Sequence, residues 1–330
     1  MNDRDFLFLA SMLRAREVGM LGEERISRLL DASKFGDAAK LLVDCGYPDM
    51  SEMSMNQIND ALEARRSDIF HEISTYSYAL GVLDLFRIKY DYHNVKVLVK
   101  SMGANVDAEY LLSGSGRIDA KQLTEAFITG QRGDLPPPVA IAMGTAVGIL
   151  SRTGDPQLSD IQIDKAYFNE LSSLAIRLKE AFITDYVQLL IDSANLRMVV
   201  RAARIGRGKD FLLNSLIPGG SVGVELVASS YDERNDSAPA LYFNSMLVQA
   251  VQPGIEAMKG GTQTIFELAC DNAVLRYATN TTFISFGPAP VIAYLSKVEW
   301  EITVVRMVLT GKYTGISPDA IRERLRECHV

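Results

Sequence analysis

Acids and amides at a regular spacing are the residues of this chain that are best placed to do chemistry. They follow a pattern of acid, two variable residues, Asn, an aliphatic residue and a base. The three copies are Asp91, Asn94 and Lys96; Asp192, Asn195 and Arg197; and Glu301, Val304 and Arg306. A carboxylate with an amide one helical turn away could bind a ligand or move a proton, or it could serve only to pack helices.

The recurrence of this motif favours the structural use. A catalytic group of residues is needed once, whereas this pattern recurs and has Val304 in place of its Asn in the third copy. Buried asparagines that fix the register of packed helices explain Asn94 and Asn195 better. The three bases either pair with acids of an adjacent helix or face an acidic partner, and both uses remain open at this stage.

Other enzymatic motifs are incomplete. The Gly-Lys at 208–209 resembles part of a phosphate-binding loop, but Ala203 replaces the first Gly and Asp210 replaces the hydroxyl residue. The glycines at 113–117 lack the third Gly of a dinucleotide loop, and His71-Glu72 lacks the second His of a zinc protease. We therefore predict no catalytic residue, no cofactor, no metal site and no small-molecule substrate.

A basic segment near the middle of the chain is the candidate partner-binding site. It contains Arg204, Arg207 and Lys209. Cations near the end of a helix are stabilised by the helix dipole, so the segment is either a solvated helix end or a docking site for an acidic partner.

Composition narrows the class of protein. With 34 basic and 41 acidic residues the formal charge is −7, which disfavours nucleic-acid binding. The cysteines are an odd, widely spaced set that fits a reducing compartment: Cys45, Cys270 and Cys328. The longest apolar stretch, 139–150, is much shorter than the roughly 20 residues of a spanning helix. Since no signal-peptide pattern opens the chain, we expect a cytoplasmic protein.

Proline placement and periodicity predict an all-α fold. Prolines are absent from 49 to 135 and from 157 to 217, which permits long helices. Apolar residues recur at three- and four-residue steps over 69–90, 167–182 and 291–309, and Ser54 with Gln57 matches a capping box. We also expect a surface loop within 218–239, which includes 231–237, and a closing helix over 319–327.

The motif copies divide the chain into three similar units. Their spacing is close to one third of the chain each time, and the first two are followed by a leucine pair and then by Gly-x-Ile or Gly-x-Val. With the proline-rich break at 133–138 and the polar connection before residue 237, we predict helical units at 1–132, 133–236 and 237–330.

These motifs, in this order, resemble the C/d subunit family of rotary V/A-type ATPases and ATP synthases. The similarity also covers the stretches at 13–30, 164–171 and 287–294, and it spans nearly the whole chain. Two departures are Val304, where the family usually has Asn, and a shorter, more polar link at 231–237.

The resemblance implies a funnel of three helical units with pseudo-threefold symmetry. In this family such a protein sits on the membrane proteolipid ring, peripheral to the cytoplasmic face, and receives central stalk subunits D and F in its cavity. The membrane stator subunit is a further candidate partner. It would be a non-catalytic rotor piece in proton or sodium transport. The alternative function is a helical-repeat scaffold that binds a peptide or protein in a groove.

Overall fold

The computed structural model describes residues 3–104, 109–232, 236–281, 284 and 286–327. Within these ranges every regular element is a helix, so the predicted all-α class is confirmed. The chain divides into two compact units: one joins 1–68 with 181–330, and the other is the continuous segment 69–180. The division into three units at 132 and 236 stays a prediction.

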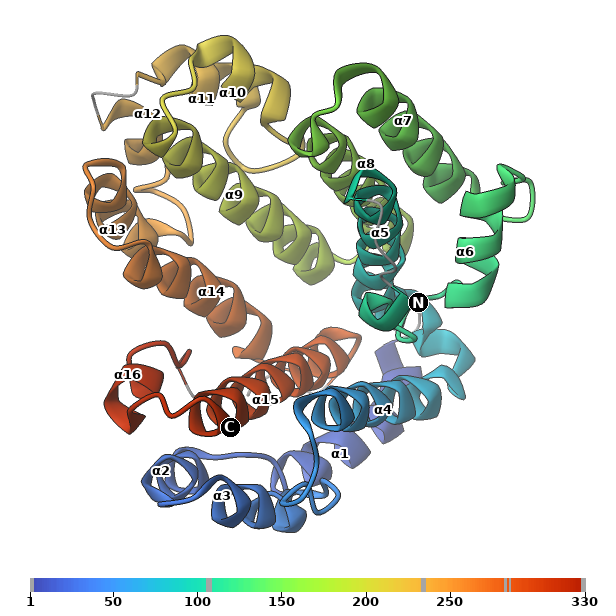
Figure 1. Cartoon of the computed structure of the whole chain (residues 1–330), viewed down its shortest axis with the longest axis vertical. Coiled ribbons are helices and arrows are strands. Elements are labelled where there is room, and N and C mark those ends of the chain that lie inside the picture. Colours follow the sequence, from blue (N-terminus) through green and yellow to red (C-terminus); the bar gives the residue numbers. More distant parts are fainter. Residues whose placement is uncertain (1–2, 105–108, 233–235, 282–283, 285, 328–330) are drawn as a thin grey trace. The chain divides into compact units, whose positions relative to one another are not determined.

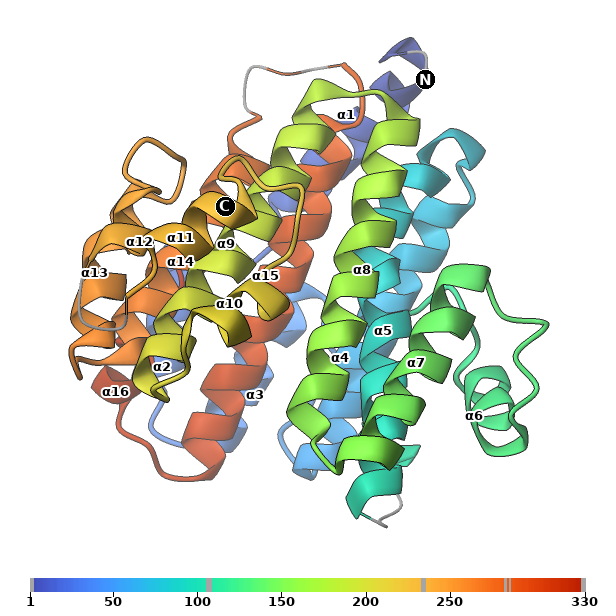
Figure 2. The same cartoon turned by 90° about the horizontal axis from the view of Figure 1, so that it is seen from above.

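The continuous unit is built around α5 (Leu80–Ala104), which packs against α6 (Ala120–Thr129), α7 (Pro137–Thr153) and α8 (Pro156–Leu178). Figure 2 shows α5, α7 and α8 running side by side. Local sequence fixes where these helices begin. Asp119 and Asp155 accept hydrogen bonds from the first free N–H groups of α6 and α8, and proline occupies the first turn of α7 and α8.

The other unit is made from both ends of the chain. Its first part contains α1 (Phe6–Glu17), α2 (Glu23–Asp31), α3 (Phe35–Leu41) and the start of α4 (Met55–Ser74). Both α1 and α3 pack against the long helix α15 (Ala289–Tyr313). The capping box at the start of α4 is confirmed, because the Ser54 N–H donates to the Gln57 side chain and the Gln57 N–H donates back to Ser54.

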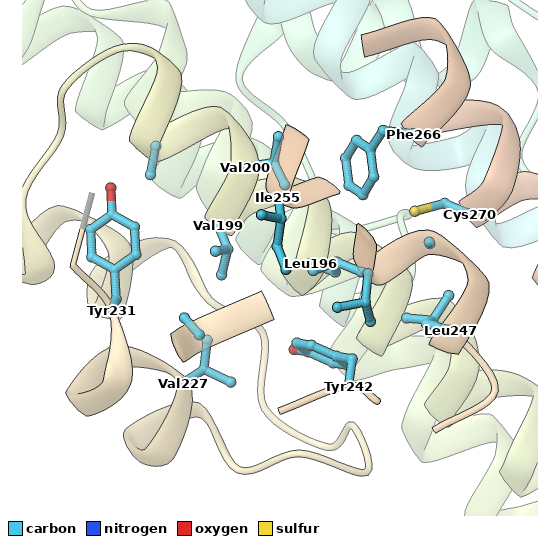
Figure 3. Packing of buried hydrophobic residues seen from close by; sticks show 14 of the residues in the cluster. Leu196, Val199, Val200, Val227, Tyr231, Tyr242, Leu247, Ile255, Phe266 and Cys270 are labelled. Carbon is cyan, nitrogen blue, oxygen red and sulfur yellow. The ribbon is translucent and has the colours of Figure 1, made fainter. Parts of the chain in front are cut away.

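The second part of this unit surrounds α9 (Ala181–Arg204), which contacts α13 (Val248–Met258) and α14 (Gln263–Thr279). Leu196, Val199 and Val200 of α9 enter a core that also contains Tyr242 and Phe266 (Figure 3). Burial of each such aliphatic side chain stabilises the fold by about 1.5–3 kcal/mol. The short helices around this core are α10 (Lys209–Ser215), α11 (Val224–Ser230) and α12 (Ser237–Ala240), which Figure 1 shows next to α9. Helix α16 (Pro318–Arg322) contacts α15 and α2 instead.

Two of the three apolar patterns cross a helix boundary that the sequence did not predict. The pattern over 69–90 is interrupted between α4 and α5, where the Ser74 and Thr75 hydroxyls donate to carbonyls of the last helical turn. The pattern over 167–182 is interrupted at Lys179, which adopts a left-handed φ of 57° after α8. The pattern over 291–309 lies wholly within α15.

The predicted closing helix and the predicted surface loop also differ from the structure. The predicted closing helix is only α16, five residues long. The connection expected to be a loop contains α11, and Tyr231 is buried in the core around α9, where its hydroxyl donates to the carbonyl of Arg207. The centre of the expected loop at 231–237 lies outside the described residues.

Candidate functional site: anchored acids and a basic helix end

Asp91 of α5 is fully buried and receives a complete set of donors. Its Oδ1 accepts the backbone N–H groups of Arg117 (2.8 Å) and Ile118 (3.1 Å), and its Oδ2 accepts Arg117 Nε (2.7 Å). Burial raises the pKa of Asp91, while Arg117 acts in the opposite direction. The carboxylate therefore holds the loop at 113–118 against α5.

Arg117 connects this carboxylate to a second buried acid. Its other arm donates to Glu170 Oε1 of α8 at 2.8 Å, and the Tyr92 hydroxyl donates to Glu170 Oε2 at 2.8 Å. One guanidinium between two carboxylates satisfies charges that would otherwise be costly to bury. Sequence reasoning missed the roles of Arg117, Glu170 and Tyr92, because only the fold brings Arg117 to Asp91 and places Glu170 against Arg117 and Tyr92.

Asn94, one turn along α5, fixes the same loop at a second point. Its Nδ2 donates to the Ser113 carbonyl and its Oδ1 accepts the Ser113 N–H, both at 2.8 Å. The predicted burial of Asn94 and Asn195 is confirmed. The expected partner in another helix is wrong, since both asparagines pair with the backbone of the loop that follows their own helix.

The second copy of the motif repeats this arrangement inside the other unit. Asp192 of α9 accepts the N–H of Ser221 (3.0 Å) and the Ser221 hydroxyl, and Asn195 exchanges two 2.8 Å hydrogen bonds with the backbone of Ile217. Burial raises the pKa of Asp192 against the effect of the Ser221 hydrogen bonds. This carboxylate is therefore held by neutral donors, whereas Asp91 is held in part by a guanidinium.

The third copy is anchored by the beginning of the chain. Glu301 of α15 accepts the Leu21 N–H (2.7 Å) and the Tyr47 hydroxyl (2.8 Å). Burial raises its pKa. Val304 is buried and provides no amide. Sequence analysis missed Leu21 and Tyr47 because it compared each acid only with the residues that follow it.

Two glycines make room for the first two acids. A Cβ placed on Gly116 would lie 2.4 Å from Asp91 Oδ1, and one on Gly220 would lie 2.3 Å from Asp192 Oδ1. These glycines precede the residues whose N–H groups bind the carboxylates, so their lack of a side chain allows the close approach.

Each motif base makes a contact within its own unit, and Lys96 and Arg197 pair with acids of an adjacent helix, one of the two uses that the sequence left open. Lys96 lies 2.6 Å from Asp164 of α8. Arg197 bonds Glu267 and Asp271 of α14, the latter at 2.7 Å. Arg306 Nε donates to Asn59 Oδ1 of α4 at 3.2 Å.

The candidate partner-binding cations differ from one another. Arg204 is held by the carbonyls of Ala257 (2.6 Å) and Gly261 (2.9 Å), near the end of α13. Arg207 and Lys209 are exposed, and the Arg207 guanidinium lies 5.2 Å from the centre of the Phe211 ring. Arg204 therefore has a structural role of its own, while Arg207 and Lys209 face solvent.

The buried acids of the motif anchor segments of their own units. Burial raises the pKa of the Cys45 thiol, and that of Cys270 to about 12, so neither forms a reactive thiolate. In the described part of the chain no group of acids, histidines and cysteines could hold a metal ion, and no helix is long and apolar enough to cross a bilayer.

Comparison with known proteins adds a family match. The family model described as ATP synthase (C/AC39) subunit matches residues 9–324. The C subunit of the A-type ATP synthase of Halobacterium salinarum is 23% identical, over 97% of both chains. The C subunit of the V-type sodium ATPase of Enterococcus hirae is 20% identical over 97% of this chain and 98% of its own. The C subunit of the A-type ATP synthase of Methanocaldococcus jannaschii is 22% identical over 97% of this chain and 86% of its own length.

Proposed function

This chain belongs to the ATP synthase (C/AC39) subunit family, and we propose that it is a non-catalytic central-rotor subunit of a V/A-type rotary ATPase. In this role it is a socket that links central stalk subunits D and F to the membrane proteolipid ring on the cytoplasmic face. The observation that carries the proposal is the family match over nearly the whole chain, together with relatives named as C subunits that match this chain almost end to end.

The chemistry of the motif agrees with a role without catalysis. Each acid of the repeated pattern is buried and accepts hydrogen bonds from backbone, hydroxyl or guanidinium donors. A general acid or base needs a free face from which to reach a substrate, and these three carboxylates are directed at donors of their own unit: the following loop for Asp91 and Asp192, and the N-terminal segment for Glu301. Such anchors suit a protein that transmits torque, because they tie long helices to the segments that connect them.

We extend the proposal to the arrangement of the chain as a funnel of three similar helical units with pseudo-threefold symmetry. The support is local. Helices α5 and α9 each carry an acid and an Asn that bind the loop after the helix, and α15 carries Glu301 in the corresponding place. Superposing the three helices with their anchored loops in an experimental structure tests this; unrelated positions for Asp91, Asp192 and Glu301 would contradict it.

Co-purification tests the proposed function directly. The tagged full chain is expressed with stalk subunits D and F, and separately incubated with detergent-solubilised proteolipid ring. We expect it to be recovered in a stoichiometric complex with D and F and to bind the ring, with an unrelated helical protein of similar charge as the control. Recovery with neither would overturn the proposal.

A further inference from the structure

The end of α9 and the start of α10 carry charges of one sign only. The segment 193–209 contains no carboxylate, although the whole chain carries a net charge of −7. Its cations are Arg197, Arg201, Arg204, Arg207 and Lys209. Arg197 and Arg204 are bound to acids and carbonyls of their own unit. The other three are exposed, and we call them the basic triad.

Arg201 of α9 corresponds in the repeated motif to Lys100 of α5, which has an internal acidic partner. Lys100 follows Asp91 at the same distance as Arg201 follows Asp192, and Lys100 pairs with Asp160 of α8 at 2.7 Å. Asp160 lies one turn before Asp164, the acid that binds Lys96. On α14, the residue one turn before Glu267, which binds Arg197, is Gln263. At this sequence offset, the acid that pairs with Lys100 of α5 has a neutral counterpart on α14, while the charge of Arg201 is kept.

Two exposed aliphatic side chains lie among these cations. Ile205 is 49% exposed and follows Arg201 by four residues, while Leu213 is 42% exposed and follows Lys209 by four residues on α10. Lys209 and Leu213 are therefore neighbours on the helix, and Ile205 directly follows α9, where its N–H donates to the carbonyl of Arg201. The surface therefore offers two cation–aliphatic pairs, and Arg207 is supported by the ring of Phe211.

We propose that the basic triad, with Ile205 and Leu213, is a docking surface for an acidic amphipathic helix of a protein partner. Carboxylates of such a helix would pair with the cations, and its apolar side chains would cover the two aliphatic residues. A phosphate group would leave the aliphatic residues uncovered, so the pattern fits a peptide better than a lipid headgroup or nucleic acid. This inference rests on the proposed function only in that a rotor protein needs protein partners.

Fluorescence anisotropy tests the surface with a defined probe. The probe is a fluorescein-labelled helical peptide of about 20 residues with glutamates along one face and leucines beside them, and its control has glutamine at every glutamate position. The full chain is compared with Arg201→Gln/Arg207→Gln/Lys209→Gln and with the reversal Arg201→Glu/Arg207→Glu/Lys209→Glu. The matched control variant is Lys34→Glu/Lys40→Glu/Lys121→Glu, at exposed lysines elsewhere.

The expected results separate this inference from the proposed function. The full chain and the matched control should bind the acidic probe, more weakly as salt increases, and charge reversal should weaken binding by about tenfold or more. Equal binding by the reversed chain, no binding by the full chain, or stronger binding to vesicles of anionic phospholipid than to the probe would overturn the surface. If the full chain and all of its variants fail to bind D and F, that result overturns the proposed function but not the docking surface.

Discussion

Replacement of Gly116 by Ala should destabilise the unit formed by residues 69–180. The new Cβ would lie 2.4 Å from Asp91 Oδ1, and this carboxylate cannot move aside cheaply because Arg117 and two backbone N–H groups hold it. Moving Oδ1 away weakens the hydrogen bonds from Arg117 and Ile118 to a buried charge, each worth about 1.5–3 kcal/mol. The smaller unfolded-state entropy of Ala returns less than about 1 kcal/mol. The expected net loss in the free energy of unfolding is about 2–4 kcal/mol.

The matched control is Gly114→Ala in the same loop. A Cβ at Gly114 meets nothing within 4 Å, and its φ is not in the left-handed region. Its stability should stay within about 0.5 kcal/mol of the parent. Urea unfolding followed by far-UV circular dichroism measures the difference, and hydrogen exchange by mass spectrometry should show faster exchange at 113–118 and in α5 for the Gly116 variant. Equal stability of the two variants would refute the close-approach argument.

Four further outcomes follow from the anchors and from the incomplete phosphate motif. Asp192→Asn removes a carboxyl group whose pKa is raised above 3.8 by burial, so the stability that Asp192 confers is lost as the pH rises through its folded pKa. Urea midpoints measured from about pH 4 to pH 7 should therefore show the parent losing stability relative to the variant. A gain in the stability of the parent over this range would contradict the argument. Asn195→Leu leaves the N–H and carbonyl of Ile217 unpaired and should cost about 2–4 kcal/mol in urea unfolding, unlike a substitution at an exposed residue. Arg117→Met leaves the buried carboxylates of Asp91 and Glu170 without their cation and should lower the free energy of unfolding by about 3 kcal/mol in the same assay. An unchanged urea midpoint would show that Arg117 does not stabilise these two acids. Isothermal titration with Mg-ATP should give no saturable heat, because the Gly-Lys at 208–209 lacks the other groups that bind phosphates; a micromolar signal would oppose a non-catalytic role.

The positions of the anchoring acids and asparagines could be predicted from sequence because their type and spacing recur. Burial of Asn94 and Asn195 followed from this pattern, since a polar residue kept on an apolar helix needs a buried partner. The identity of the partners did not follow. Ser113 and Ile217 contribute backbone groups, which any residue has, so their side chains contain no signal of the contact.

The helix boundaries that the sequence missed have a different cause. The break after α8 occurs at Lys179, a residue type that gives no turn signal and rarely adopts a positive φ. The break after α4 depends on Ser74 and Thr75, whose hydroxyls bond carbonyls of the preceding turn. Ser and Thr do this in helix interiors as well, so their presence alone does not end a helix.

The hydrogen bond from Leu21 to Glu301 joins residues that are 280 positions apart. On a ribosome that adds about 5–20 residues per second, the N-terminal helices wait roughly 14–56 seconds before this acid is synthesised. The continuous segment 69–180 needs no later residue to complete its own anchors, so it can fold during this interval. We therefore expect the order of folding to be the reverse of the order of synthesis for the first two parts of the chain, with the α15-facing side chains of α1 and α3 accessible to chaperones until α15 emerges.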